Sequence, residues 1–266
     1  MLRAVDLGRS LHIDNCVGDP SREITHAAPL DEAGEGALTW LRVPYTIPAN
    51  LVGATVIFDR LASYAPEHWP IENTYLVVDD PRLVMAVALE RYIEPMMPYH
   101  PFEEPNNCDV NVTADVHGCV KMGRHVIVGP GAVIGSRGFG FVRRGMDLEY
   151  FPHVGGVLLG DDVEIQANTC VDRAALGMTR IAARTKIDNL VHIGHGAQIG
   201  QRVCIAACAE IGAGVVIEDG VWIGPRACTI ENITIGEKAI LGIGAVVLRD
   251  VPAGETWVGN PARRLH

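Results

Sequence analysis

The sequence predicts a mainly β protein: a left-handed parallel β-helix that follows a small α/β domain. Two observations predict the β-helix, an apolar residue at every sixth position through most of the second half and a small residue directly after many of them. A period of six fits neither the 3.6-residue period of an α-helix nor the alternation of a long strand. It is typical of short strands separated by tight turns, which stack as the coils of a β-helix.

This six-residue (hexapeptide) repeat runs through three segments, and within the longest only Thr229 departs from it. Its apolar positions are Val110, Val116, Met122, Val128 and Ile134, then Leu159, Ile165 and Val171, then Ile181, Ile187, Ile193, Ile199, Ile205, Ile211, Ile217, Ile223, Ile235, Leu241 and Val247. We expect these side chains to point into the β-helix. Glycines after them, as in Ile193-Gly194, suit turns with unusual backbone angles. A β-sandwich with coincidental spacing is the alternative, and the length of the register argues against it.

Two interruptions of the repeat predict loops that leave the stack. The larger spans residues 136–156 and holds four aromatic residues and the basic pair Arg143-Arg144, and the smaller lies between Val171 and Ile181. A β-helix extrudes insertions without disturbing its coils, and long loops on rigid scaffolds often carry function. We therefore assign the β-helix domain to residues 99–266, with 136–156 as an inserted loop.

Residues 1–98 lack the repeat and predict a small α/β domain. Short β-like runs occur at 54–58 and 74–80, and a helix is expected after them, with Asp80 as its N-cap and Pro81 in its first turn. The expected apolar face of this helix is Leu83, Val84, Val87 and Ala88. A proline-rich segment, 96–107, predicts a linker to the β-helix.

Composition excludes several classes of protein. The chain is 48% hydrophobic and 20% charged, as in globular proteins, and no apolar run approaches the ~20 residues that span a bilayer. A net charge of −10 argues against nucleic-acid binding. The seven cysteines include no CxxC pair, so neither a disulfide framework nor a zinc ribbon is predicted. The N-terminal residues resemble no export signal, so we expect a cytoplasmic protein.

Two histidines in the run IDNLVHIGHGAQIG are the candidates for acid–base chemistry. His195 falls at a turn position, where a neutral imidazole can take a proton from an amine or hydroxyl that attacks a thioester. A surface histidine on a turn is the alternative for both residues, and it is favoured for His192. A zinc site shared between β-helices would need a GHxxxxH run, and Gly200 stands at its second histidine position. No metal site is predicted.

Three repeats per coil place residues eighteen apart on neighbouring coils, ~4.8 Å from each other. Ala213 should therefore lie beside His195, where its backbone N–H can stabilise a developing oxyanion. When the four extra residues of the smaller insertion are allowed for, Asp172 falls on the coil before His195. Asp172 either orients the imidazole or forms a structural turn with Arg173.

These stretches resemble the UDP-3-O-acylglucosamine N-acyltransferases of lipid A synthesis. The runs GSRGFGF at 135–141, VDRAAL at 171–176 and KIDNLVHIGHGAQIG at 186–200 are similar to the family motifs GSDGFGY, DRGAL and IDNxxQIAHN. The runs at 24–41 and 76–89 resemble that family's uridine-binding domain. The resemblance implies that His195 is the catalytic base, that position 213 supplies the oxyanion N–H, and that the enzyme acylates a sugar amine as a homotrimer with sites between subunits.

Two departures from the family pattern concern binding residues. Asn232 stands where the family carries a second histidine, and Tyr45 follows Trp40 by five positions where the family's two aromatic residues are six apart. Trp40 and Tyr45 are therefore either core aromatics or a pair that stacks on a nucleotide base. The substrate-binding candidates are Trp40, Tyr45, Phe139, Phe141, Asn189, His192 and Asn232.

The C-terminal run LRDVPAGETWVGNPARRL instead resembles coenzyme A-dependent hexapeptide acetyltransferases of sugars. We therefore interpret the chain as an N-acyltransferase that uses an acyl-CoA to acylate a nucleotide-linked amino sugar for envelope polysaccharide. One alternative is the lipid A reaction itself, from acyl carrier protein to UDP-3-O-(3-hydroxyacyl)glucosamine. Another is a non-catalytic scaffold that binds nucleotide sugars. In both enzymatic cases the acyl thioester is a cosubstrate, and no permanent cofactor is expected.

Overall fold

The computed structural model describes residues 2–41, 47–48, 50–60, 69–96, 105 and 107–265. The chain forms two compact units, Met1–Pro98 with Gly140–Val154, and Tyr99–Phe139 with Gly155–His266. The middle of the 136–156 insertion groups with the first unit because its hairpin contacts a helix of that unit. Within the described part of the chain, no helix is long and apolar enough to cross a membrane.

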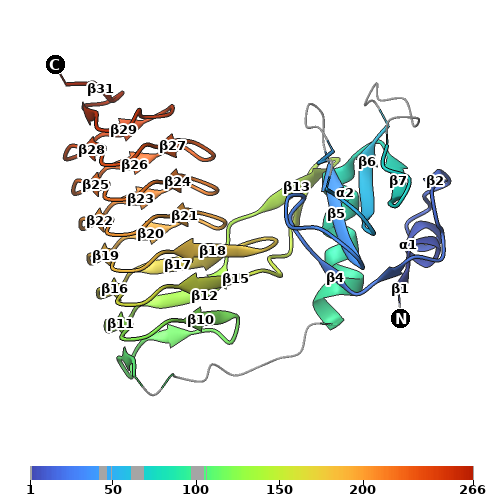
Figure 1. Cartoon of the computed structure of the whole chain (residues 1–266), viewed down its shortest axis with the longest axis horizontal. Helices are drawn as coiled ribbons and strands as arrows, with labels where there is room; N and C mark the ends of the chain where they lie inside the picture. Colours follow the sequence, from blue (N-terminus) through green and yellow to red (C-terminus); the bar gives the residue numbers. More distant parts are fainter. Residues whose placement is uncertain are drawn as a thin grey trace. The chain divides into compact units, whose positions relative to one another are not determined.

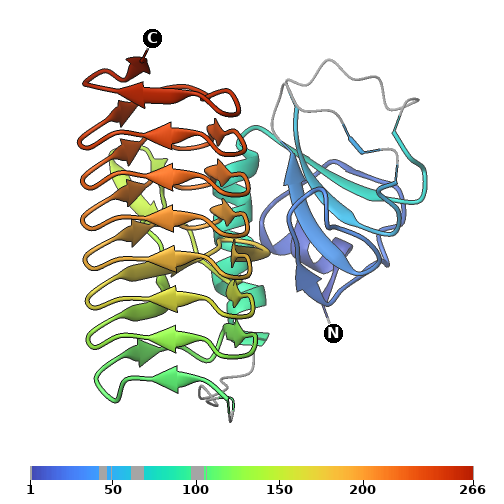
Figure 2. The same ribbon diagram turned by 60° about the vertical axis from the view of Figure 1, so that its left-hand side comes forward.

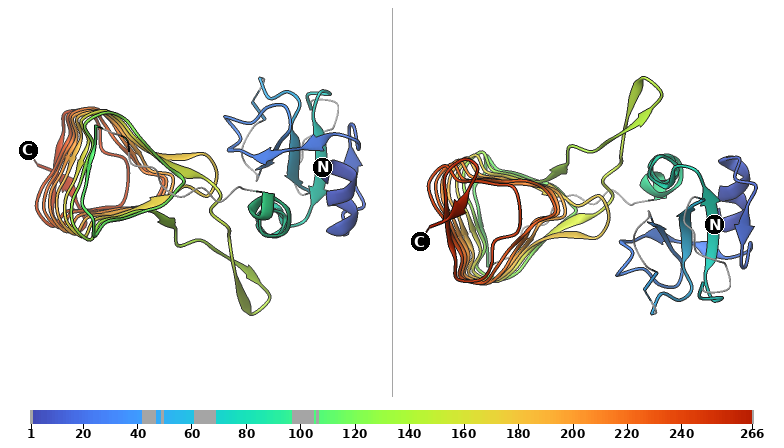
Figure 3. Two further views of the ribbon diagram at one scale, coloured as in Figure 1. Left: turned by 90° about the horizontal axis from the view of Figure 1, so that it is seen from below. Right: turned by 90° about the horizontal axis from the view of Figure 1, so that it is seen from above.

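The second unit is the predicted left-handed parallel β-helix, whose coils are stacked in Figures 1 and 2 and form a triangle when viewed end-on in Figure 3. Three sheets form its sides, and each coil passes from a nine-stranded to a seven-stranded and then to a six-stranded sheet. The nine-stranded sheet contains β8 (Asp109–Val110), β11 (Ile127–Val128), β16 (Glu164–Ile165), β19 (Lys186–Ile187), β22 (Cys204–Ile205), β25 (Trp222–Ile223), β28 (Ile240–Leu241), β30 (Thr256–Val258) and the antiparallel β31 (Arg263–Arg264).

The other two sheets meet at the corner from which both insertions leave. The seven-stranded sheet contains β9 (Asp115–Val116), β12 (Val133–Arg137), β17 (Cys170–Arg173), β20 (His192–Ile193), β23 (Glu210–Ile211), β26 (Cys228–Thr229) and β29 (Val246–Val247). The six-stranded sheet contains β10 (Val120–Met122), β15 (Gly156–Leu159), β18 (Met178–Ile181), β21 (Gln198–Ile199), β24 (Val216–Ile217) and β27 (Thr234–Ile235). We call this edge, where β12, β17, β20 and β23 lead into β15, β18, β21 and β24, the insertion corner.

The core of the β-helix consists of the repeat residues, as predicted. Ile134, Ile193 and Ile223 have no exposed surface, and the other repeat positions from Val128 onward are also buried. Thr229, the exception in the sequence, is 9% exposed, and its hydroxyl accepts a hydrogen bond from the Gly212 N–H at 2.9 Å. The buried hydroxyl is therefore satisfied, which is the condition for a polar group to replace an aliphatic one in a core.

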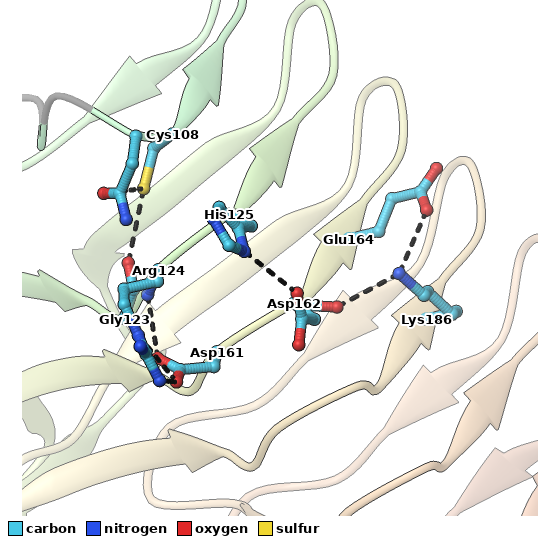
Figure 4. Close-up of polar contacts among 9 residues, drawn as sticks. Cys108, Gly123, Arg124, His125, Asp161, Asp162, Glu164 and Lys186 are labelled. Carbon is cyan, nitrogen blue, oxygen red and sulfur yellow. Dashed lines mark hydrogen bonds and ion pairs between the residues drawn. The ribbon is translucent and has the colours of Figure 1, made fainter.

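Polar contacts on the outside of the early coils link one coil to the next (Figure 4). Arg124 and Asp161 form an ion pair at 2.6 Å, and the Lys186 ammonium lies 3.3 Å from Glu164. The Cys108 thiol donates to the Gly123 carbonyl at 3.3 Å. Exposed ion pairs of this kind contribute about 0–1 kcal/mol each, so the buried repeat holds the stack together.

The first unit is built on a five-stranded sheet. Its order is β2 (Cys16–Val17), β7 (Thr74–Val78), β6 (Thr55–Asp59), β5 (Ala37–Leu41) and β4 (His26–Ala27), and only β2 is antiparallel to its neighbour. Its smaller elements are β1 (Leu2–Arg3), α1 (Ala4–Ser10), β3 (Glu23–Ile24) and the hairpin β13 (Phe141–Arg144) and β14 (Asp147–Tyr150). The predicted α/β character of residues 1–98 is confirmed.

Helix α2 (Pro81–Ala88) begins where the sequence predicted. The Asp80 carboxylate accepts a hydrogen bond from the Leu83 N–H at 3.1 Å, and Pro81 occupies the first turn. The buried face is partly different, since Met85 and Ala86 are buried while Leu83 is only half-buried. The helix contacts both β5 and β6 of the sheet and β13 of the hairpin, so more than one face is covered. A π-helical turn, η2 (Leu89–Ile93), and a 3-10 turn, η3 (Glu94–Met96), extend it.

Candidate active site

His195 lies at the insertion corner, directly after β20. The ladder between β20 and β23 pairs His192 with Glu210 and Ile193 with Ile211, and continuing this register places Ala213 opposite His195. The ladder between β17 and β20 pairs Val171 with Ile193, so Asp172 lies on the coil before it. The offsets predicted from the repeat are therefore those of the structure.

Hydrogen bonds hold the turn that carries His195 in place. Gly196 adopts a φ of +74°, a conformation that glycine reaches without strain, and its N–H donates to the Thr179 hydroxyl at 2.8 Å. The Thr179 hydroxyl in turn donates to the Asp172 carbonyl at 2.7 Å. On the other side, the His195 carbonyl accepts from the Gly214 N–H at 3.0 Å. The backbone around the imidazole is thus tied to the coils before and after it.

Asp172 is a buried carboxylate near both histidines. Its side chain accepts a hydrogen bond from the Ser136 hydroxyl at 3.0 Å, and its second oxygen lies 3.8 Å from His192 Nε2. Burial raises the pKa of Asp172, while the positive charges that His192 and His195 can carry and the Ser136 hydrogen bond act in the opposite direction. Asp172 is thus a carboxyl group held between two coils, with Ser136 on one side and His192 on the other.

The backbone N–H of Ala213 is the candidate oxyanion donor. Among the described residues, it has no hydrogen-bond acceptor. The ladder in the next coil is irregular, because β23 and β26 pair only at Glu210 and Cys228 and the Thr229 hydroxyl takes the Gly212 N–H. A donor of this kind, on a half-buried residue opposite His195, can bind an oxygen that gains negative charge.

Two other predicted residues serve the turns of the β-helix. Asn189 lies at the other end of β20 from His195, where its amide oxygen accepts from the Ala167 N–H at 3.1 Å and its amide nitrogen donates to Asp188 at 2.7 Å. Asn232 lies at the insertion corner with a φ of +57°, the left-handed turn position that asparagine tolerates, and it is exposed. The structure brings Asp172, His192 and Ala213 to the corner of His195, but not Asn189.

The predicted aromatic residues are distributed over both units. In the first unit, Trp40 is half-buried with its ring centroid 6.4 Å from that of Phe151, and Phe141 lies edge-on to Tyr150 at 5.8 Å. Phe139 belongs to the second unit and is 88% exposed. Tyr45 lies outside the described residues.

Sequence reasoning missed Ser136 and Thr179, which contact Asp172 through its side chain and its carbonyl. Ser136 stands within the GSRGFGF run, which was a usable signal, whereas Thr179 follows the smaller insertion without any motif. In the described part of the chain, no group of three or more His, Cys, Asp and Glu side chains is arranged to hold a metal ion.

A hollow of about 320 Å³ lies elsewhere, on the nine-stranded sheet, between residues that include Glu164, Lys186 and Trp222. None of the predicted site residues lines it. The candidate active site is instead the insertion corner, because His195, Asp172 and the Ala213 N–H come together there on neighbouring coils.

The fold and the site define a class, the hexapeptide acyltransferases. A family model described as bacterial transferase hexapeptide (six repeats) matches residues 178–213, which include His195 and Ala213. The chain is 34% identical to the UDP-3-O-acylglucosamine N-acyltransferase of Caulobacter sp. (strain K31), across 91% of this chain and 83% of that protein. It is 31% identical to UDP-3-O-acylglucosamine N-acyltransferase 2 of Rhodopseudomonas palustris (strain BisB18), across 92% and 79%.

The chain belongs to the UDP-3-O-acylglucosamine N-acyltransferase family and is an acyltransferase. Among solved structures, the Arabidopsis UDP-N-acetylglucosamine acyltransferase matches with a TM-score of 0.51 over 94% of this chain and 73% of that one. Sequence identity in that comparison is 17%, so the likeness concerns the fold alone.

Proposed function

We propose that this acyltransferase moves an acyl group from a carrier thioester to the amine of UDP-3-O-acylglucosamine, as in lipid A synthesis. The observation that carries the proposal is the grouping of three residues on neighbouring coils at the insertion corner: Ala213 lies opposite His195 on the next coil, and Asp172 lies on the coil before, opposite Gly194. The relatives favour this acceptor over the wider class of nucleotide-linked amino sugars, because their names specify it and the similarity covers 91% of the chain.

In the proposed reaction, the amine nitrogen of the sugar attacks the carbonyl carbon of the thioester while the His195 imidazole takes a proton from that nitrogen. Negative charge develops on the carbonyl oxygen, and the Ala213 N–H stabilises it. When the carbon–sulfur bond breaks, the thiolate leaves and receives the proton from His195. The products are the N-acyl sugar and a free carrier thiol. Asp172 is a positioning residue, and its carboxylate stabilises the protonated imidazole.

The donor has two candidates. An acyl carrier protein that delivers a 3-hydroxyacyl group is the donor that the family resemblance implies. An acyl-CoA is the second candidate, and the run at 248–265, which resembles coenzyme A-dependent acetyltransferases, favours it. For the nucleotide of the acceptor, the proposed binding surface on the first unit consists of Trp40 and the 140–154 hairpin.

A cytoplasmic homotrimer is the proposed assembly. The outer face of the nine-stranded sheet carries Ile127, Trp222 and Ile240, each at least 41% exposed. Large apolar side chains that recur along one flat face are typical of surfaces that associate.

The test uses the purified full chain with UDP-3-O-acylglucosamine and either a 3-hydroxyacyl carrier protein or acetyl-CoA, and product is measured by mass spectrometry. His195→Asn should lower turnover by about 10²–10⁴-fold, the usual contribution of a positioned base. His125→Asn is the matched control, because His125 is an exposed histidine at another corner of the β-helix.

Three outcomes bear on the choice between candidates. Product formed only from acetyl-CoA would show that the donor is an acyl-CoA and not an acyl carrier protein. Full activity of His195→Asn would remove the base assignment. No product with either donor, together with tight binding of the nucleotide sugar, would favour the non-catalytic scaffold.

A further inference from the structure

Two arginines face each other on neighbouring coils at the insertion corner. Arg137 of β12 pairs with Arg173 of β17 in the parallel ladder. Continuing the register between β17 and β20 by two residues places Arg173 opposite His195. Arg137, Arg173 and His195 therefore form a column on three successive coils, with ~4.8 Å between neighbours.

A β-bulge at Gly135 produces this pairing. The register between β12 and β17 shifts between Ile134 and Ser136, so Gly135 is an extra residue in its strand. Gly135 has a φ of +87°, a conformation that favours glycine. A Cβ at this position would also lie 2.8 Å from the Val120 side chain, so the backbone angle and the lack of space both favour glycine. Without the bulge, Ser136 would face Arg173 and Arg137 would lie one position further along. Bulges commonly redirect side chains next to functional sites.

One donor atom of Arg173 lacks an acceptor. Its Nε is buried and has no hydrogen-bond partner within the part of the chain that the structure describes. The nearest carboxylate in the sequence, Asp172, is already engaged by Ser136 and lies beside His192. Like charges directly opposite each other on neighbouring strands destabilise a sheet, and a buried donor without an acceptor is also unfavourable. An anion bound at Arg173 would give the unpaired Nε an acceptor and would lie between two positively charged residues.

We propose that Arg137 and Arg173 form a phosphate-binding subsite one coil from the catalytic histidine. This inference rests on the proposed function, in which both substrates carry phosphate: the nucleotide sugar has a diphosphate, and the acyl carrier has a phosphate ester on its pantetheine arm. A guanidinium presents its donors as a planar fork that matches phosphate oxygens, which a lysine would not do. A phosphate held by Arg173 places the attached substrate next to His195.

The experiment measures binding by calorimetry on the full chain and its Arg137→Gln, Arg173→Gln and double variants. One arm compares UDP with uridine, and the other compares 4′-phosphopantetheine with pantetheine. Arg184→Gln is the matched control, because Arg184 is an exposed arginine at a different corner of the same β-helix. Urea unfolding of each variant checks that it folds, and Arg137, being exposed, offers a second variant with little effect on the core.

Arg173→Gln should weaken the phosphate-bearing member of one pair by about 10- to 100-fold, the range expected for a charge-assisted hydrogen bond. The phosphate-free member should change less than about twofold. A loss confined to UDP assigns the subsite to the nucleotide sugar, and a loss confined to phosphopantetheine assigns it to the donor. Arg173→Lys should recover part of the loss.

The proposal is overturned if neither phosphate ligand binds the parent chain measurably, if the double variant binds both as the parent does, or if Arg184→Gln weakens them equally. Because binding is measured without turnover, failure of the phosphate subsite can be distinguished from failure of the proposed reaction. A chain that binds UDP through Arg173 and transfers no acyl group to UDP-3-O-acylglucosamine would refute the proposed function and leave the subsite in place.

Discussion

Gly194→Ala tests whether the spacing between the coils of His195 and Ala213 controls acyl transfer. A Cβ on Gly194 would lie 2.7 Å from the Ala213 nitrogen and 2.9 Å from the Ile211 oxygen, whereas ordinary contacts begin at 3.4 Å. These atoms belong to the backbone of the next coil, which cannot rotate away as a side chain can. The two coils must therefore separate locally by about 0.7 Å.

That displacement moves the proposed oxyanion donor relative to the proposed base. A misplacement of ~1 Å can lower a rate by about 10²-fold. We therefore expect Gly194→Ala to lower kcat by about 10- to 100-fold. The overpacking should also lower the free energy of unfolding by about 1–3 kcal/mol.

Gly224→Ala is the matched control for this prediction. Gly224 follows β25 as Gly194 follows β20, and its Cβ would meet the Leu241 oxygen at 2.7 Å and the Ile243 nitrogen at 2.9 Å. The stability loss should be similar, measured by urea unfolding, but the corner is a different one and kcat should be unchanged. Equal rates in the two variants would refute the role assigned to the spacing between His195 and Ala213.

Two further predictions concern the residues that support His195. Thr179→Val removes the hydroxyl between the Gly196 N–H and the Asp172 carbonyl, so urea unfolding should show a loss of about 1–3 kcal/mol. Asp172→Asn should stabilise the chain at neutral pH while lowering the rate of acyl transfer. Burial raises the pKa of Asp172, so between the ordinary Asp value of 3.8 and the raised value the folded parent binds more protons than the unfolded one. Its free energy of unfolding therefore falls as pH rises through that window, and the advantage of Asp172→Asn should grow there. An advantage that is the same at about pH 3 and pH 7 would contradict burial as the cause.

The coils were predictable because the repeat converts sequence separation directly into position. An offset of eighteen placed Ala213 opposite His195, and one correction for the smaller insertion placed Asp172 on the preceding coil. The same offsets do not predict the partners of Ser136 and Arg137 on the next coil. Gly135 adds one residue to β12 without interrupting the hydrophobic pattern. A bulge of this kind depends on backbone angles at one glycine, which spacing does not record.

Asparagines were the least predictable of the candidate binding residues. A polar side chain at a corner of a β-helix can face a ligand or satisfy its own turn, and the spacing is the same in both cases. Asn189 bonds to Ala167 of the preceding coil and to Asp188 of its own turn, and Asn232 adopts left-handed backbone angles. Trp40 shows a related limit, because its neighbour Phe151 is more than a hundred positions away in the sequence.

The location of the site at one corner follows from the mechanics of the fold. Strands on the flat sides must keep the repeat, since every second side chain fills the core, so new chemistry can enter only where a coil turns. Both insertions, the bulge at Gly135 and the turn of His195 lie on three successive coils at the insertion corner. The turns that carry His195 and Ala213 use Gly196 and Gly214 in left-handed conformations, and the following turn at this corner uses Asn232. The other two corners use both glycines, such as Gly220 and Gly244, and side chains, such as Arg184 and Arg226. The turns nearest His195 thus carry no side chain at their left-handed position, and both insertions leave the stack at the same corner, so this edge is where the fold can place catalytic groups without disturbing the core.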